Sequence, residues 1–372
     1  MTTKGQDLHV NPEYPEDLPY RKILDHGFVA LIDVMGTDAS IVQAARVSYG
    51  KGTKTMRTDK ALIGYLMRHA HNTPLEMVEF KFLMRIPLFI ARQVIRHRTA
   101  SVNEYSARYS VVPDRFFVPP LGAISSQDHV NRQGRTDLLR ELAEQAPERE
   151  DPCAYLSGEK AILVNEEGVG ISRAALLVHE HRAAFAGAPE ALPSETYVQC
   201  ADRLLGLFPQ RKAELEGLQA LYRENNERCY ALYQRFLEQG VAREIARCVL
   251  PLSMYTEWYW KIDLHNLLHF LRLRMDSHAQ LEVRALAEAM ATFVKPQVPF
   301  VWEAFEEHRV RGTILSAPEM DALRPVDDAT RREVLVGLFE RGFQRLRLKE
   351  FCRKLDIDER IVDELWPPGA KQ

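Results

Sequence analysis

Cysteine is scarce in this sequence, and no two cysteines are closely spaced. The 372 residues include five cysteines, scattered along the chain and never arranged as C-x-x-C. An odd, scattered set argues against a disulfide scaffold or a zinc ribbon and fits a reducing cytoplasm. The start MTTKGQDLHVNPEYPEDLPYRK has no apolar core, so we expect no signal peptide. No run of about 18 apolar residues occurs, so we expect a cytoplasmic protein without a membrane partner.

An excess of one charge is also missing. The formal net charge is −3, with 46% hydrophobic and 27% charged residues, which is ordinary globular composition. Without a strong positive field we expect no nucleic-acid partner, and any basic function must be local. Glycine-rich phosphate loops are absent as well, because GKGTK at 50–54 lacks the spacing of a P-loop and GVGISR at 168–173 lacks the last glycine of a dinucleotide fingerprint.

Hydrophobic periodicity predicts a mixed α/β chain. Alternation is clearest over 76–87, where one face carries Val78, Phe80, Phe82, Met84 and Ile86 and the other carries Glu79, Lys81 and Arg85. Further strands are expected over 27–36 and 254–262. Helices are expected over 38–49 (capped by Asp38 or Ser40), 59–70, 88–97, 211–239, 241–249, 263–275 (capped by Asp263), 278–294 and in the charged tail 313–372.

The longest expected helix bears on assembly. From 211 to 239 apolar residues follow helical spacing, and Gly240 suits the C-terminal cap. Such a helix is about 40 Å long and needs neighbours along its length, which favours an oligomer. Residues 119–209, by contrast, carry many turn signals and no steady period, so we interpret them as an inserted, partly helical excursion.

One polar segment, RHRTASVNEYSARYS at 96–110, concentrates hydrogen-bond donors. Its arginines Arg96, Arg98 and Arg108 present forked donors suited to phosphate or carboxylate. Serine hydroxyls, the amide of Asn103 and the carboxylate of Glu104 accompany them. This set could hold a phosphorylated ligand such as a nucleotide. The alternative is a solvated loop whose arginines pair with acids elsewhere in the chain.

The same segment resembles the signature of the flavin-dependent thymidylate synthases, R-H-R-x-x-S-x-N-E-x-S-x-R, at every fixed position. Other segments resemble the family in family order: IDVMGTDASIVQAARVSYGKGTK, HNTPLE, ARQVIRHR, REIARCVLPLSMYT and RLRMDSHAQ. The resemblance implies a family domain formed by 1–118 and 210–312, an insertion of unknown role at 119–209 and a helical C-terminal extension at 313–372.

The resemblance also implies a fold and a reaction. Members of the family are homotetramers of an α/β subunit with a mostly antiparallel central sheet and long helices, and each active site is shared between subunits. They are FAD-dependent methyltransferases that convert dUMP to dTMP. The carbon comes from 5,10-methylenetetrahydrofolate, and NADPH supplies reducing equivalents through bound FAD.

Site residues follow from the matching positions. The expected FAD contacts are His71, Thr73, Arg96, His97, Arg98 and Glu104. The expected dUMP contacts are Gln93, Arg96, Glu104, Ser106, Arg108, Arg247 and Arg274. The segment DLHNLLHF departs from the family, because Asp263, His265 and His269 stand at FAD-associated positions where relatives carry Asn, Arg and Asn.

Arg274 is the residue expected to be catalytic. Uracil C5 must become electron-rich before it attacks an electrophilic carbon, and a fixed guanidinium beside N3 and O2 would stabilise the developing anion. The alternative is a structural salt bridge to Asp276 or another acid. No cysteine falls inside the signature to act as a nucleophile, Cys248 is expected to be a core residue despite its neighbour Arg247, and Ser106 has no obvious base.

Two other functions remain open at this level. A nucleotide-binding or RNA-binding protein without catalytic activity could use the arginine-rich segment. A metallohydrolase could use His265 and His269, which share one helix face, with His278 as a third ligand. No H-E-x-x-H pattern or clear carboxylate partner accompanies these histidines, so we predict no metal site.

Overall fold

The computed structural model describes residues 15, 17–47, 56–129, 134–145, 193–276, 278–312, 314, 316–318, 328–343, 345–355, 357–358 and 360–364. The chain divides into two compact units, Met1–Arg311 and Gly312–Gln372. Each unit is described by itself.

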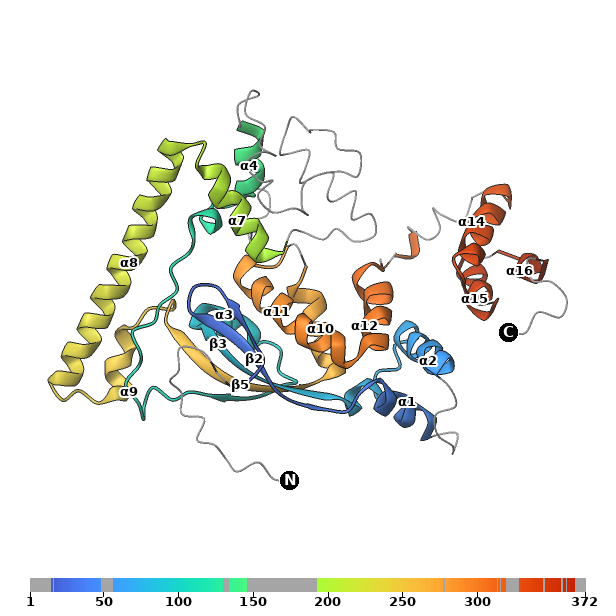
Figure 1. Ribbon diagram of the computed structural model, residues 1–372, viewed down its shortest axis with the longest axis horizontal. Coiled ribbons are helices and arrows are strands. Elements are labelled where there is room, and N and C mark those ends of the chain that lie inside the picture. The colour runs from blue at the N-terminus through green and yellow to red at the C-terminus, as the bar shows by residue number, and fades with distance from the viewer. Residues whose placement is uncertain are drawn as a thin grey trace. The chain divides into compact units, whose positions relative to one another are not determined.

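A five-stranded antiparallel sheet is the centre of the first unit (Figure 1). Its strands are β1 (Tyr20–Ile23), β2 (Gly27–Met35), β3 (Glu79–Pro87), β4 (Ser101–Glu104) and β5 (Tyr255–Asp263). The strand order is β1-β2-β3-β5-β4, and every neighbouring pair is antiparallel. The last strand in sequence therefore lies between β3 and the strand of the polar signature.

The described helices of the first unit include α1 (Asp38–Arg46), α2 (Met56–Arg68), α3 (Leu88–Val94), α4 (Leu138–Gln145), α7 (Ser194–Leu205), α8 (Pro209–Glu238), α9 (Arg243–Ala246), α10 (Leu264–Arg274), α11 (Leu281–Gln297) and α12 (Pro299–Phe305). Figure 1 shows α3, α10 and α11 together over the sheet and α8 to one side. The architecture confirms the predicted α/β class with a mostly antiparallel sheet.

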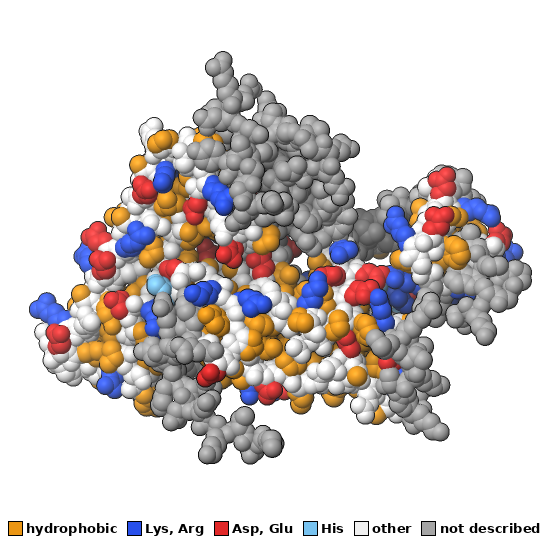
Figure 2. Space-filling view, viewed as in Figure 1, with side chains coloured by type: hydrophobic (Ala, Val, Ile, Leu, Met, Phe, Trp, Pro, Cys, Tyr) orange, Lys and Arg blue, Asp and Glu red, His pale blue; other side chains and the backbone are white. Residues whose placement is uncertain are grey.

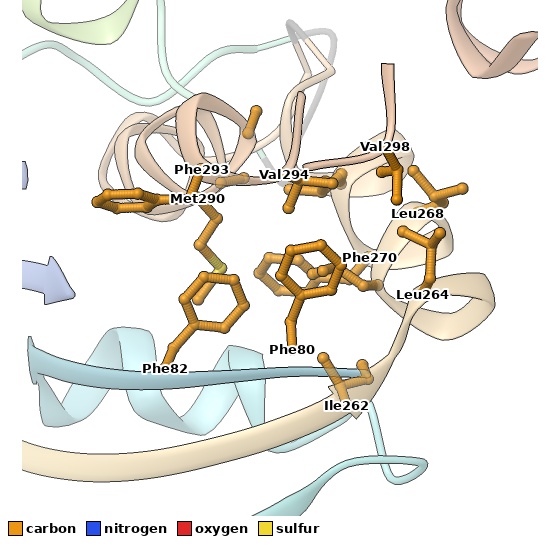
Figure 3. Close-up of a cluster of buried hydrophobic side chains, with 14 of the residues drawn as sticks. Phe80, Phe82, Ile262, Leu264, Leu268, Phe270, Met290, Phe293, Val294 and Val298 are labelled. Atoms are coloured by element: carbon orange, nitrogen blue, oxygen red, sulfur yellow. The ribbon is translucent and has the colours of Figure 1, made fainter. Parts of the chain in front are cut away.

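The main core forms between one face of the sheet and the covering helices. Alternation in β3 buries Phe80 and Phe82 completely, as the sequence predicted. Figure 3 shows both rings pointing toward Met290 and Val294 of α11 and toward Phe270 of α10. Because aromatic and aliphatic side chains from sheet and helices interdigitate here, α10 is held firmly against β5 and its C-terminal residue has a fixed position.

The opposite face of β3 is not uniformly exposed. Arg85 was predicted on the polar face, and it does lie there, but it is 3% exposed. Its Nε lies 2.7 Å from Glu257 Oε1 on β5, and its guanidinium lies over the Phe28 ring at 4.8 Å from the centroid. Burial is possible because the charge is paired with a carboxylate and faces an aromatic ring.

The cap of α1 differs from the prediction. Thr37 is the N-cap residue, and its backbone N–H donates to Ser40 Oγ at 3.1 Å. Asp38 instead accepts hydrogen bonds from the backbone N–H groups of Phe300 (2.9 Å) and Val301 (3.1 Å) at the start of α12. Burial raises the pKa of this carboxyl, while these two bonds oppose the increase. A residue expected to start one helix therefore stabilises the start of another.

Two other predicted helices have different ends. The helix α3 already ends at Val94. The helix predicted over 278–294 begins at Leu281, because Asp276 accepts a hydrogen bond from the His278 backbone N–H at 2.8 Å and keeps this segment in a turn.

The long helix α8 is confirmed. Gly240 follows its C-terminal cap with a φ of +78°, and its N–H donates to the Leu237 carbonyl at 3.0 Å. Only three of its residues are buried, namely Leu215, Asn226 and Tyr233. Four of its apolar side chains are 40–60% exposed in the single chain: Leu218, Leu221, Tyr222 and Leu232.

The described parts of the predicted excursion form a small second core. Helices α4 and α7 bring together Leu138, Leu139, Leu142, Cys200, Ala201, Leu204 and Leu205, with Leu215 of α8. This second core packs α4 and α7 against α8 within the first unit.

The described residues of the second unit include three helices, α14 (Asp328–Glu340), α15 (Arg345–Leu355) and α16 (Arg360–Glu364). Leu335, Leu348, Cys352, Ile357 and Val362 form a buried cluster of this unit.

The described surface mixes both charge signs. Figure 2 shows Lys and Arg side chains interspersed with Asp and Glu on the face drawn there. Among the described residues, no helix is long and apolar enough to cross a membrane.

Candidate active site

The signature segment lies at the edge of the sheet, where β5 brings distant residues to it. Gln93 lies in α3, His97 follows that helix, and β4 pairs with β5 so that Val102 faces Trp260 and Glu104 faces Trp258. Because β5 leads directly into α10, the end of that helix comes close to the start of the signature.

A hydrogen bond between Arg274 and His97 joins the two regions. Arg274 Nε donates to His97 Nε2 at 3.2 Å. The His97 ring also meets the Phe270 ring edge-on, with the centroids 4.9 Å apart. Burial, followed by the electrostatic effects of Arg274 and His269, lowers the pKa of His97 to about 4. The imidazole is therefore neutral at pH 7 and can accept the hydrogen bond that orients Arg274.

The predicted alternative for Arg274, a salt bridge to Asp276, is not formed. The Asp276 carboxylate instead contacts His278 Nδ1 at 2.8 Å. The terminal amino groups of Arg274 have no hydrogen-bond partner among the described residues, and burial lowers the pKa of this guanidinium. A half-buried arginine with unused donors is suited to an anionic or electron-rich ligand.

Gln280 is a site neighbour that sequence reasoning missed. It is the N-cap residue of α11, and its side-chain oxygen accepts a hydrogen bond from Gln93 Nε2. This contact ties a predicted dUMP residue to the turn after Arg274. The segment RLRMDSHAQ contains Gln280, but nothing in its pattern indicates the contact with α3.

Thr256 is a second missed residue. Its Oγ1 donates to Glu104 Oε1 at 2.7 Å, and Thr256 itself is 4% exposed. Alternation in MYTEWYWKI places Thr256 on the covered face with Trp258, which was a usable signal for burial. Glu104, which is exposed, thus has one carboxylate oxygen held by a side chain of β5.

Arg108 is paired with an acidic residue of α9 instead of with the residues around Arg274. Its Nη2 lies 2.9 Å from Glu244 Oε2 of α9, and both side chains are about half exposed. The Arg108 backbone N–H donates to Ser106 Oγ at 3.4 Å. Arg247 begins the short 3₁₀ turn that follows α9. A hollow of about 460 Å³ is lined here by Arg108, Tyr109, Val111, Gly240, Arg243 and Glu244, among others.

The predicted residues therefore form two groups within one chain. The first contains Gln93, His97, His269 and Arg274, and the second contains Ser106, Arg108 and Arg247 near α9. Among the described residues, no hydrogen bond or ion pair joins the first group to the second. In the single chain Arg108 pairs with an acid, as the alternative for a solvated loop predicted. Such an exposed pair contributes little stability and can exchange for a ligand anion.

Of the remaining predicted residues, Arg96 and Arg98 flank His97 in sequence, and His71 and Thr73 lie in the turn between α2 and β3. Arg96 and Arg98 are exposed. His71 is exposed, and the Tyr65 ring meets its ring edge-on with the centroids 5.7 Å apart. The Thr73 carbonyl accepts the Glu76 N–H at 3.2 Å.

The segment DLHNLLHF, which departs from the family pattern, has a structural role at its first residue. Asp263 caps α10 as predicted, because it accepts the Asn266 backbone N–H at 3.0 Å and the Asn266 Nδ2 at 2.7 Å. His265 is half-buried, and His269 lies with its ring centroid 6.2 Å from that of His97. Among the described residues, no group of three or more His, Cys, Asp or Glu side chains is placed to hold a metal ion.

Neither candidate nucleophile has an activating partner. Ser106 has no imidazole or carboxylate partner among the described residues. Cys248 is exposed, so the prediction of a core residue is wrong. The helix predicted there ends early, at Ala246, and the following turn directs Cys248 outward, with its Sγ 3.7 Å from the Glu244 carbonyl.

Comparisons with known proteins agree with the signature. The family model described as "Thymidylate synthase complementing protein" matches residues 30–163 and 168–300. A flavin-dependent thymidylate synthase from Rickettsia conorii is 42% identical over 315 residues, covering 82% of this chain and 83% of the relative. Another, from Ruegeria pomeroyi, is 40% identical over 328 residues, covering 87% and 83%.

A solved structure is similar as well. The crystal structure of a UMP/dUMP methylase, PolB from Streptomyces cacaoi bound with 5-Br dUMP, aligns with a TM-score of 0.51 and 27% identity, covering 78% of this chain and 97% of that one. Signature, sheet and sequence similarity over most of the chain lead to one conclusion, that this protein belongs to the flavin-dependent thymidylate synthase family.

Proposed function

We propose that the protein is a flavin-dependent thymidylate synthase that methylates dUMP to dTMP. In this proposal 5,10-methylenetetrahydrofolate donates the carbon, and NADPH supplies reducing equivalents through bound FAD. The observation that carries the proposal is the placement of Arg274, whose guanidinium is oriented by a neutral His97 inside the family signature. Family membership supports the reaction class.

Arg274 is assigned the catalytic role. Its unused amino groups would donate to uracil O2, beside N3, and stabilise the negative charge that develops when C5 becomes nucleophilic. His97 would act as a positioning residue, because a neutral acceptor holds Nε and leaves the terminal nitrogens for the nucleotide. Gln93, linked to Gln280, would contact the same base from α3.

The second group is assigned to the nucleotide phosphate. Arg108 and Arg247 would supply the charge, and Ser106 a hydroxyl. The ion pair of Arg108 with Glu244 is exposed, so exchanging the carboxylate for a phosphate costs little. Glu104, oriented by Thr256, would lie between the nucleotide and the flavin.

The residues present fit a flavin. Arg96 and Arg98 offer exposed cationic donors for a diphosphate, and His71 and Thr73 would contact the ring system. When bound, the flavin supplies the reducing equivalents for the methyl group. Of the departing residues, His265 and His269 would contact FAD through their rings, while Asp263 would act mainly by capping α10.

A homotetramer with shared active sites is part of the proposal. The exposed apolar side chains of α8 offer a surface for another subunit. The separation of the Arg108 group from the Arg274 group is also expected if each site takes residues from more than one chain. Residues 1–118 and 210–312 would form the catalytic domain, 119–209 the insertion and 313–372 the extension.

One anaerobic assay tests this function. The purified protein should be yellow, NADPH should bleach the flavin absorption, and dTMP should form from dUMP and methylenetetrahydrofolate. Arg274→Ala should retain FAD and lose dTMP formation, while Arg272→Ala on the same helix should retain both. A colourless protein, or full synthesis by Arg274→Ala, would contradict the proposal.

A further inference from the structure

The first turn of α11 contacts the candidate site on one side and the excursion at 119–209 on the other. Gln280, the N-cap residue, accepts a hydrogen bond from Gln93 of α3. Glu282 follows in the first turn, and its Oε1 lies 3.3 Å from Nη1 of Arg135, which belongs to the excursion. The two contacts are therefore separated by less than one turn of a single helix.

The start of α11 has no side-chain cap of its own. A residue at the N-cap position often accepts a backbone N–H of the first turn with its side-chain oxygen. Gln280 makes no such bond, because its oxygen accepts from Gln93 instead. Apolar packing fixes the body of α11 against the sheet, as Figure 3 shows. The directional contact of the first turn comes from Glu282, which is 4% exposed.

A second set of contacts joins the next turns of α11 to α7, which lies beside it (Figure 1). Arg284 is 5% exposed, and its Nε donates to Ser194 Oγ at 2.9 Å. The backbone N–H of Ser194, the first residue of α7, donates to Glu288 Oε2 at 2.9 Å. A carboxylate of α11 thus satisfies a donor at the start of α7, where negative charge is favourable.

These buried polar contacts determine position more than they add stability. A buried ion pair loses hydration on folding, and apolar side chains of similar volume often stabilise a protein as well or better. Its hydrogen bonds are directional, however, so they fix the geometry of the groups that they join. Arg135 Nη1 also donates to the Ala123 carbonyl at 2.8 Å, which holds the guanidinium from the excursion side.

We propose that Arg135 is a positioning residue for dUMP: its contact with Glu282 places the start of α11 so that Gln280 holds Gln93 against the nucleotide base. The inference rests on the proposed function and gives the excursion a part in substrate binding. The effect should equal that of one well-placed hydrogen bond, because a single contact to the base depends on it. Losing such a bond weakens affinity about three- to tenfold.

Steady-state kinetics of the FAD-loaded full chain test this inference. Arg135→Met should raise the KM for dUMP about three- to tenfold and change kcat by less than about twofold, because the lost contact is made equally in the ground and transition states. Gln280→Ala should have the same effect. Adding Arg135→Met to Gln280→Ala should raise KM no further, since both act through one contact. Effects that multiply, or an unchanged KM in Arg135→Met, would overturn the inference.

Two more variants separate positioning from stability. Arg135→Met with Glu282→Leu removes both charges, so it should regain most of the stability lost in Arg135→Met but keep the raised KM. This double variant decides if Arg135→Met alone does not fold. Leu142→Ala in the second core is the control, and it should lower the free energy of unfolding without changing KM. A normal KM in the double variant, or a raised KM in Leu142→Ala, would mean that Arg135 is only structural.

Hydrogen exchange measured by mass spectrometry gives a readout that needs no turnover. The Arg284 amide donates to the Gln280 carbonyl at 3.0 Å, and in Arg135→Met the peptide that contains it should exchange several-fold faster. Peptides from α8 should be unchanged. An unaltered protein that forms no dTMP would overturn the proposed function and this inference with it. Unchanged exchange at the start of α11 in an active enzyme would overturn the inference alone.

Discussion

The Arg274–His97 contact predicts a large and specific change in a histidine pKa. The pKa of His97 is lowered from 6.5 to about 4, first by burial and then by Arg274, whose Nε lies 3.2 Å from the ring nitrogen. Because burial is the larger cause, less than half of the shift belongs to Arg274, and we assign to it about one pKa unit, or about 1.4 kcal/mol. Arg274→Met should therefore raise the pKa of His97 to about 5.

Nuclear magnetic resonance with labelled histidine can measure this value in the full chain. The chain has 12 histidines, and His97 is identified as the signal that His97→Gln removes. Arg272→Met, on the same helix, serves as the control and should leave the titration unchanged. A value near 6.5 in the unaltered protein would refute the reasoning. So would an Arg274→Met variant in which His97 titrates unchanged.

The same group links stability to acid. The unfolded chain takes up a proton at His97 near pH 6.5, whereas the folded chain resists protonation until about pH 4. The folded state is thus favoured fully above pH 6.5 and loses this contribution as the pH falls through that window. After allowance for the partial exposure of the ring, the loss is about 1–2 kcal/mol. Urea denaturation at pH 7 and pH 4.5 should show it, and His97→Gln should reduce the difference.

Three further substitutions test other contacts of the fold and the site. Arg85→Met leaves the mostly buried Glu257 without its guanidinium partner and should reduce the free energy of unfolding by about 3–5 kcal/mol. The double variant Arg85→Met with Glu257→Leu should recover most of this stability. If urea denaturation shows a loss for Arg85→Met as small as that of a surface substitution, this reasoning is wrong. Asp263→Ala should cost about 1 kcal/mol through loss of the α10 cap, and Asp263→Asn much less; equal losses would mean that the cap is unimportant. Thr256→Val should lower turnover several-fold with little change in dUMP KM or stability, since Glu104 loses its orienting donor, while Thr256→Ser should retain activity; an equally impaired serine variant would indicate packing instead.

Local periodicity was enough to predict β3, β5 and α10 beside the site, but not the short strand β4 within the signature. Alternation in 76–87 located β3 and its buried face, and Asp263 was identified as a cap because capping depends on neighbours in sequence. The hydrogen-bond and ion-pair partners of Asp38 and Arg85 could not be predicted from periodicity. Asp38 accepts bonds from the start of α12, and Arg85 is buried by an acid on another strand, so both depend on tertiary contacts.

The candidate site shows the same division. The signature identified His97 and Glu104 by their order in the chain, but their partners are known only from the folded chain. Thr256 and Gln280 approach the signature because β5 lies beside β4 and α10 returns toward α3. A single sequence carries periodicity and motif order, and neither of these specifies which side chains meet across the sheet.

The position of β5 has a consequence for synthesis on the ribosome. Strand β4 has β5 as its one neighbour in the sheet, so the nascent chain must be extended by about 150 residues before β4 can pair. At about 5–20 residues per second this takes roughly 8–30 s. During that interval an unpaired edge that carries the signature arginines is exposed to other chains and to chaperones. Completion of this edge of the sheet is therefore a late event in synthesis, and stalling before Tyr255 should leave it unassembled.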